Sequence, residues 1–178
     1  MTKKLSVIAL LVLLAASCGG NVEKQDTMQL TVSDITAKTA DYVGQEVSIT
    51  GTVEHVCRHG GKRLFIIGED PKDRFKITAG PAVGTFDMSL EGSDIRVVGV
   101  VQEQVIDEAY LDNWEAEVGA GAKPEVGHQG HDRSNIEEED HSEESVRQIN
   151  MMRKKLEESG KESLSFYSLE CQSFEILE

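Results

Sequence analysis

The sequence predicts a small, mainly β domain with helical additions, carried behind an export leader. Residues 47–53 alternate between apolar and polar side chains, which is the period of a half-buried strand. Residues 95–101, Ile-Arg-Val-Val-Gly-Val-Val, are a second, more continuously apolar stretch that also predicts a strand. Both segments have a glycine near the centre, Gly51 and Gly99, and long glycine-bent strands help a small sheet to coil into a closed barrel. Ahead of both lies a run of apolar residues, 5–14, that is too short to cross a bilayer, which takes about 20 residues.

The leader has the charge pattern of a secretory signal, because Lys3 and Lys4 precede the apolar run and small residues follow it up to Cys18. The segment Leu14-Ala15-Ala16-Ser17-Cys18 resembles the lipobox of bacterial lipoproteins, although that family usually has Leu in the place of Ala15. The resemblance implies that residues 1–17 are removed and that Cys18 is lipid-modified. The alternative is an ordinary signal peptide in which the cysteine is incidental.

A lipid on Cys18 would attach the domain to a membrane of the cell envelope. Gly19 follows that cysteine, and Asp does not, which by resemblance to sorting in bacteria with two membranes favours the outer membrane. The protein would then face the periplasm or the cell surface. The formal net charge of −14 becomes about −16 when Lys3 and Lys4 leave with the leader. Such a chain repels phosphate backbones, so we expect no nucleic acid partner.

Residues 18–30 are polar and predict a tether between the lipid and the domain. Ser33 or Asp34 can accept hydrogen bonds from the first turn of a helix, and Gly44 can end it, so we expect a helix over residues 34–42. Strands are predicted at residues 47–57, 63–67, 74–78 and 94–106, and a turn at residues 59–62. In the loop 79–92, three apolar residues are expected to plug one end of the core: Phe86, Met88 and Leu90.

Residues 108–160 form an insertion before the last strand. Residues 109–118 predict a helical turn packing Tyr110, Leu111 and Trp114, and residues 119–144 predict a flexible, then acidic, loop. A second helix carries an apolar stripe, which we expect to pack across the open end of the barrel or, alternatively, to receive a partner helix; the stripe is Val146, Ile149, Met152 and Leu156. Residues 164–176 predict the closing strand, with a bulge near Ser168.

This order of elements resembles the OB-fold, a five-stranded Greek-key barrel, with the barrel formed by residues 31–107 and 161–178. Residues 40–53, the segment Val56-Cys57 with its glycine turn, and residues 97–101 also resemble a group of exported bacterial OB-fold proteins without an assigned activity. The departure from that group is the long insertion between the fourth and fifth strands. It puts in doubt any ligand site on that side of the barrel, since it could cover or extend such a site.

Two cysteines remain in an oxidising compartment, and Cys57 and Cys171 could form a disulfide, share a metal or both be buried thiols. Cys57 and His59 place a thiol and an imidazole close together, which suits zinc or copper. Cys171 is the next candidate ligand, with further candidates in the insertion: His128, His131 and His141. The alternative is that Cys57 is a small core residue, and that Cys171, at strand spacing from Leu169, faces inward as a buried thiol.

No nucleophile elbow, Walker loop or His-Glu-x-x-His motif occurs in the sequence, so we do not expect an enzyme. The dense carboxylates around Trp114 are best explained as an exposed helix face; they are Asp107, Glu108, Asp112, Glu115 and Glu117. The leading hypothesis is a membrane-anchored, non-enzymatic binding module without a cofactor, whose ligand is a protein or a saccharide. The alternative is a periplasmic metal- or haem-handling protein that uses Cys57 and His59. A periplasmic haem chaperone with an OB barrel uses His-x-x-x-Tyr, which this chain lacks.

Overall fold

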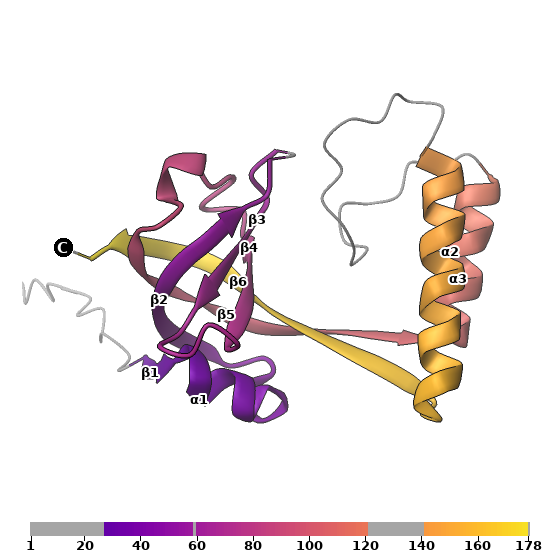
Figure 1. The fold of residues 1–178 in the computed structure, drawn as a ribbon, viewed down its shortest axis with the longest axis horizontal. Coiled ribbons are helices and arrows are strands. Elements are labelled where there is room, and N and C mark those ends of the chain that lie inside the picture. The colour runs from indigo at the N-terminus through magenta and orange to yellow at the C-terminus, as the bar shows by residue number, and fades with distance from the viewer. Residues whose placement is uncertain (1–26, 59, 121–140, 178) are drawn as a thin grey trace, which may run out of the picture.

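A computed structural model describes residues 27–58, 60–120 and 141–177, whose strands close into a five-stranded barrel with one strand outside it (Figure 1). The barrel strands are β2 (Glu46–Val56), β3 (Arg63–Ile67), β4 (Arg74–Ala79), β5 (Asp94–Asp107) and β6 (Ser163–Ile176). Their order is β2-β3-β4-β6-β5, and pairing of β2 with β5 closes the ring. The β4–β6 pair is parallel and the other barrel pairs are antiparallel. The predicted OB-fold-like Greek-key barrel is therefore confirmed.

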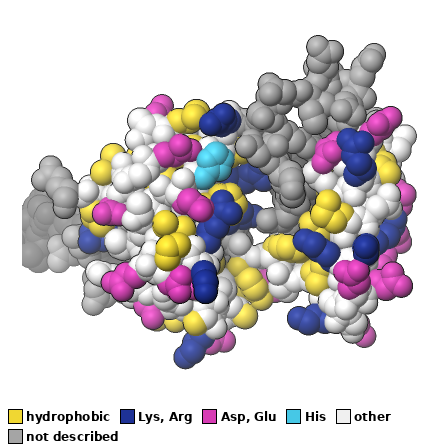
Figure 2. Space-filling model, in the orientation of Figure 1, with side chains coloured by type: hydrophobic (Ala, Val, Ile, Leu, Met, Phe, Trp, Pro, Cys, Tyr) yellow, Lys and Arg dark blue, Asp and Glu magenta, His cyan; other side chains and the backbone are white. Residues whose placement is uncertain are grey.

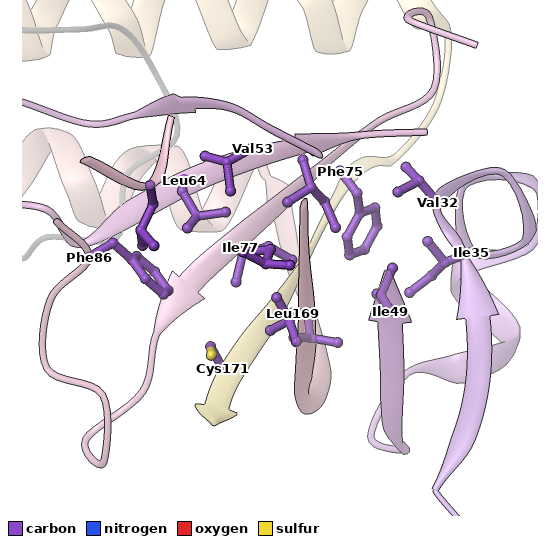
Figure 3. Packing of buried hydrophobic residues seen from close by; sticks show 14 of the residues in the cluster. Val32, Ile35, Ile49, Val53, Leu64, Phe75, Ile77, Phe86, Leu169 and Cys171 are labelled. Atoms are coloured by element: carbon purple, nitrogen blue, oxygen red, sulfur yellow. The ribbon is translucent and has the colours of Figure 1, made fainter. Parts of the chain in front are cut away.

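The barrel core consists of alternate residues from each strand, because successive side chains of a strand point to opposite faces. Figure 3 shows these side chains converging from β2, β3, β4 and β6 on one interior. Among them, Leu64 of β3, Ile77 of β4 and Leu169 of β6 are completely buried. In β2 the register shifts between Val53 and His55, and this bulge allows both Val53 and Val56 to face the core.

The predicted helix 34–42 is divided in two and starts earlier than expected. Helix α1 (Val32–Ala37) is followed by a 3-10 helix, Thr39–Tyr42. Thr31 is the N-cap: its side chain accepts a hydrogen bond from the Asp34 amide at 3.1 Å, and its own amide donates to the Asp34 carboxylate at 3.0 Å. Asp34 is thus the third helical residue and not the cap. Val32 and Ile35 are fully buried, and both belong to the barrel core.

Residues 28–31, mostly assigned to the tether, form strand β1 (Met28–Thr31) instead. This strand pairs in parallel with residues 47–50 of β2. Its sequence gives no strong strand pattern, and its side chains are mostly exposed, so the pairing depends on the neighbouring edge of β2. Cys18 and the leader lie outside the described residues.

The loop between β4 and β5 closes one end of the core with Phe86 and Leu90, which are 3% and 5% exposed. The prediction for Met88 is wrong, since that side chain is 47% exposed. The reason is a 3-10 helix, Met88–Leu90, which replaces the extended chain that would have placed Met88 and Leu90 on one side. The bulge in β6 was also misplaced: the β5–β6 register changes from Val98–Ser173 to Gly99–Cys171 and not at Ser168.

The described part of the insertion forms a pair of helices, α2 (Glu108–Gly119) and α3 (His141–Ser159). The prediction that its apolar stripe packs across the open end of the barrel is wrong. Figure 1 shows the pair standing away from the barrel at the far end of the β5–β6 ribbon. The 14-residue strands β5 and β6 stay paired out to Asp107–Ser163, which carries the insertion beyond the barrel. The helices bury a separate small core; its buried members are Ile106, Leu111, Trp114, Ile149, Met152 and Leu156.

The side chains of α2 and α3 differ from prediction at one position of the stripe. Val146 is 39% exposed, whereas Ser145 and Gln148 are buried in its place. Arg153 joins the two helices through three exposed carboxylates of α2: Glu108, Asp112 and Glu115, at N–O distances of 3.4, 2.6 and 2.8 Å. These carboxylates thus lie on an exposed helix face, as expected. No helix within the described ranges has both the length and the apolarity that crossing a bilayer requires.

Candidate ligand-binding face

Four side chains gather on the outer surface of β3 and β4. Alternation turns the even-numbered residues of β3 and the odd-numbered residues of β4 inward, so Arg63 and Phe65 point outward beside Arg74 and Lys76. The antiparallel register places Phe65 opposite Lys76. We call this group, Arg63, Phe65, Arg74 and Lys76, the β3–β4 face. In OB barrels the corresponding two strands carry the surface on which oligonucleotides and oligosaccharides bind.

The segment that contains β3 and β4 has a net charge of opposite sign to that of the whole chain. Residues 57–79 contain six Lys and Arg residues against three Asp and Glu residues, a net charge of +3, whereas the chain carries −14. Figure 2 shows several Lys and Arg side chains gathered on the barrel, on the side that faces the helical pair. The segment that contains β3 and β4 is therefore positively charged within an acidic protein.

Arg74 is held in place by two contacts. Its guanidinium carbon lies 3.9 Å from the centroid of the Phe65 ring, a cation–π contact. Its Nε atom lies 2.6 Å from the Glu54 carboxylate. The Phe65 ring therefore lies beneath a guanidinium group whose own charge is already matched by a carboxylate.

Lys76 and Arg63 are half-buried and lie near each other. Burial, together with the smaller effect of the positive charge of Arg63, lowers the pKa of Lys76 from 10.5 to about 8. Arg63 donates a hydrogen bond to the Cys57 sulfur at 3.6 Å. Among the ion pairs of the described residues, none joins Arg63 or Lys76 to a carboxylate. Two neighbouring cations without a described counter-charge repel each other, and an external anion would stabilise both.

A second group of polar contacts borders the face at the end of β2. His55, which pairs with Phe65, has its Nδ1 atom 3.0 Å from the Glu91 carboxylate. The same carboxylate oxygen accepts a hydrogen bond from the Val56 amide at 2.9 Å. This backbone hydrogen bond is the main reason that the pKa of Glu91 is lowered, with a further contribution from His55. The Glu91 carboxylate, at the edge of the β3–β4 face, is therefore already bound by His55 and by the Val56 amide.

The turn between β2 and β3 is fixed against the loop that follows β4. Gly60 and Gly61 have positive φ angles of 74° and 57°, as the predicted turn requires. A Cβ on Gly61 would lie 2.3 Å from the Phe86 carbonyl oxygen, so only glycine fits there. Lys62 donates to the Gly84 carbonyl at 2.8 Å. These contacts hold the residues just before Arg63 against the loop that follows β4.

The sequence-predicted thiols are both buried, and Cys171 belongs to the barrel core. Cys171 is fully buried and Cys57 is 8% exposed, and no disulfide joins them. The inward, buried position predicted for Cys171 is confirmed, and the disulfide alternative is not what the structure contains. Burial raises the pKa of Cys171 to about 11, which opposes the thiolate form that metals bind.

The other predicted ligands cannot be placed beside these thiols. His59, His128 and His131 lie outside the described residues, and so does the side chain of His141. Within the part of the chain that the structure describes, no group of three or more His, Cys, Asp or Glu side chains could hold a metal ion. Metal binding by Cys57, His59 and Cys171 stays a prediction from the sequence.

The β3–β4 face was missed by sequence reasoning, although its signal was present. The bounds of both strands were predicted to within a residue, and the residues of the face stand at alternate positions: Arg63 and Phe65 on β3, and Arg74 and Lys76 on β4. The period of two predicts that each of these pairs shares one side of its strand, whereas the pairing of β3 with β4 brings the two pairs together.

Titration of Lys76 should be visible in the stability of the protein. Because its pKa is about 8 when folded and 10.5 ordinarily, the unfolded chain binds more protons there between those two pH values, and stability rises with pH across that window. We expect the free energy of unfolding of the native chain, minus that of Lys76→Met, to rise from about pH 8 to about pH 10 in urea denaturation. A difference that stays level would show that Lys76 titrates like an exposed lysine.

Comparisons with known proteins add little to this description. No family model matches the chain, and no curated protein matches it. A solved structure described as an aspartyl-tRNA synthetase from Leishmania major Friedlin is similar over 47% of this chain and 17% of its own, with 17% identity and a TM-score of 0.33. The chain thus spans only about a sixth of the length of that protein, and at this TM-score we draw no argument from the similarity.

Proposed function

We propose that this protein is a non-enzymatic binding module that holds an anionic ligand on the β3–β4 face. The observation that carries the proposal is the local net charge of +3 over residues 57–79 in a chain of −14. Arg63 and Lys76 are diagonal neighbours on adjacent strands, and the positive charge of Arg63 acts unfavourably on that of Lys76. An anionic ligand would offset that repulsion, and the same strands of other OB barrels carry their ligand surface.

The proposed location of the protein is the cell envelope. The leader and the lipobox support a lipid on Cys18, and Gly19 after it supports the outer membrane. A membrane-held module needs no catalytic group to act as a receptor or carrier, which agrees with the absence of catalytic motifs from the sequence. Intact-mass analysis of the native product tests this part: an acylated chain beginning at Cys18 supports it, and an unmodified cysteine contradicts it.

The binding proposal is tested with two charge-matched triple variants. The first is Arg63→Gln, Arg74→Gln and Lys76→Gln on the β3–β4 face, and the second is Arg147→Gln, Lys154→Gln and Lys155→Gln on α3. Both lower the net charge by three. Each exposed ion pair contributes up to about 1 kcal/mol and 1.4 kcal/mol is tenfold in affinity, so we expect about a tenfold loss or more for the first variant alone.

The measurement is isothermal titration with acidic and neutral oligosaccharides, together with heat denaturation to show that both variants are folded. Equal losses in the two variants would mean that only the net charge matters. No binding of any acidic ligand by the native chain would overturn the proposal.

Metal or haem handling through Cys57 and His59 is the second candidate. Its support comes from the sequence, in which Cys57 directly follows β2 and stands two residues before His59, so that a thiol and an imidazole are close together. Elemental analysis of untagged protein tests it. A stoichiometric zinc or copper ion that is lost in Cys57→Ala would support this role, and its absence at saturating metal would remove it.

A further inference from the structure

We infer that Arg63 and Lys76 form a subsite for one acidic group of a saccharide. The inference rests on the proposed function and specifies the chemistry of its ligand. The ligand class is an oligosaccharide that carries isolated acidic groups, such as uronic acid residues, rather than a continuous polyanion.

The geometry of the β3–β4 face supports a single acidic group. Phe65 is opposite Lys76 and Arg63 is opposite Thr78, so Arg63 and Lys76 are diagonal neighbours on adjacent strands. Both side chains are half-buried, and only small movements of their ends would be needed to contact a ligand. Because little side-chain freedom would be lost, binding there costs little entropy. A guanidinium and an ammonium side by side provide several donors for one carboxylate or phosphate.

The carboxylates around this pair limit how many negative charges a ligand can have. Glu54 lies on the β2 side and binds Arg74, and Glu91 is occupied by His55 and the Val56 amide. On the other side, Glu170 of β6 pairs with Thr78, the residue opposite Arg63. A second anionic group at either side would approach one of these carboxylates and be repelled. A ligand with widely spaced charges avoids that cost.

The same surroundings argue against single-stranded nucleic acid. Sequence-independent binding of single strands combines a basic groove with aromatic rings on which bases stack. Phe65 is the aromatic residue of this face, and the Arg74 guanidinium already lies over its ring at 3.9 Å. A base would have to displace a guanidinium that is also bound to Glu54. A saccharide needs no such stacking and can contact the cations from the edge.

The test uses the mature chain, isotope-labelled for NMR, with three probes: glucuronate, glucose and a single strand of eight thymidines. We expect glucuronate to shift the amide signals of Arg63 and Lys76 in a saturable way and glucose to leave them unchanged. Lys76→Met and Arg63→Met should each weaken glucuronate binding about fivefold, since each removes one ion pair. Arg147→Met on α3 is the matched control and should bind as the native chain does.

Measuring the affinity for glucuronate at several pH values separates binding at this subsite from general electrostatic attraction to the protein. Lys76 loses its charge near pH 8, so the affinity for glucuronate should fall between about pH 7 and pH 9. Arg63 acts electrostatically on Lys76, Arg74 stands two residues before it on β4, His55 pairs with the Phe65 that lies opposite it, and Glu170 pairs with Thr78 two residues after it. Lys76→Arg keeps a positive charge over this range and should bind equally at both pH values, which assigns the change to Lys76.

The outcomes distinguish this inference from the proposed function. Saturable glucuronate binding that is lost in the triple β3–β4 variant but unchanged in Lys76→Met and Arg63→Met would overturn the subsite and leave the binding face intact. Binding of the thymidine strand in preference to glucuronate would overturn the saccharide assignment. If neither glucuronate nor the thymidine strand bound, both the subsite and the anionic-ligand proposal would be overturned.

Discussion

Replacing Gly99 by alanine should prevent the barrel from closing. Gly99 lies in the middle of β5, between Val47 of β2 and Cys171 of β6. A Cβ built on it would lie 2.1 Å from the Glu170 carbonyl oxygen and 2.7 Å from a methyl carbon of Leu169. Because the first of these is a backbone atom in a paired strand, it cannot move without breaking the ladder. We expect a destabilisation of more than about 3 kcal/mol, at or beyond the upper end of ordinary overpacking.

Gly119→Ala is the matched control for this prediction. Gly119 ends helix α2 and nothing lies within 4 Å of a Cβ built there. The same chemical change should therefore be neutral or stabilise the chain by up to about 1 kcal/mol, through the reduced freedom of the unfolded state. Urea denaturation followed by circular dichroism compares the two variants. If Gly99→Ala unfolds at the native midpoint, the close approach of β5 and β6 is not required for closure.

The second large effect is expected from Trp114→Ala, and it should be local. Trp114 is 3% exposed and packs edge-to-face with Tyr110, with ring centroids 6.4 Å apart. Removing a buried aromatic side chain of this size costs about 3–5 kcal/mol. The small core of α2 and α3 shares none of its residues with the barrel core. The helical pair should therefore open while the barrel stays folded.

Hydrogen exchange measured residue by residue tests this expectation. Amides of α2 and α3 should lose protection in Trp114→Ala, and amides of β2, β3 and β4 should keep theirs. Glu117→Ala, on the same helix, serves as the control and should change neither set. Equal loss of protection in the barrel and in the helices would show that the two cores unfold as one unit.

This separation also bears on the binding face. The barrel carries Arg63 and Lys76 on β3 and β4, whereas the insertion replaces the loop between the last two strands, which in OB barrels helps to bind ligands. In this chain that loop is a folded helical pair at the end of a 14-residue ribbon. The insertion therefore extends the molecule and does not close the end of the barrel.

Several features of the fold could be predicted from the sequence. Short apolar runs bounded by turn residues predicted β3 with its observed bounds and β5 to within one residue, because such runs are typical of strands. The inward position of Cys171 followed from its spacing to Leu169. The net charge of −14, in contrast, concealed a net charge of +3 over residues 57–79, because the net charge of a chain does not show where its charges lie. The lipid on Cys18 and the envelope location remain predictions of the sequence.

The sequence by itself determined the barrel strands and their glycine bends, because these depend on side chains within one or two residues of each other, and the closed, five-stranded barrel was expected from the resemblance of their order to the OB-fold. Only the tertiary structure decided the rest. The pairing of β1 with β2, the outward position of α2 and α3, and the juxtaposition of Arg63 with Lys76 depend on contacts between separate strands and helices. Local periodicity carries no information about which distant segment completes a contact, so the proposed binding face became visible only after the chain had been folded.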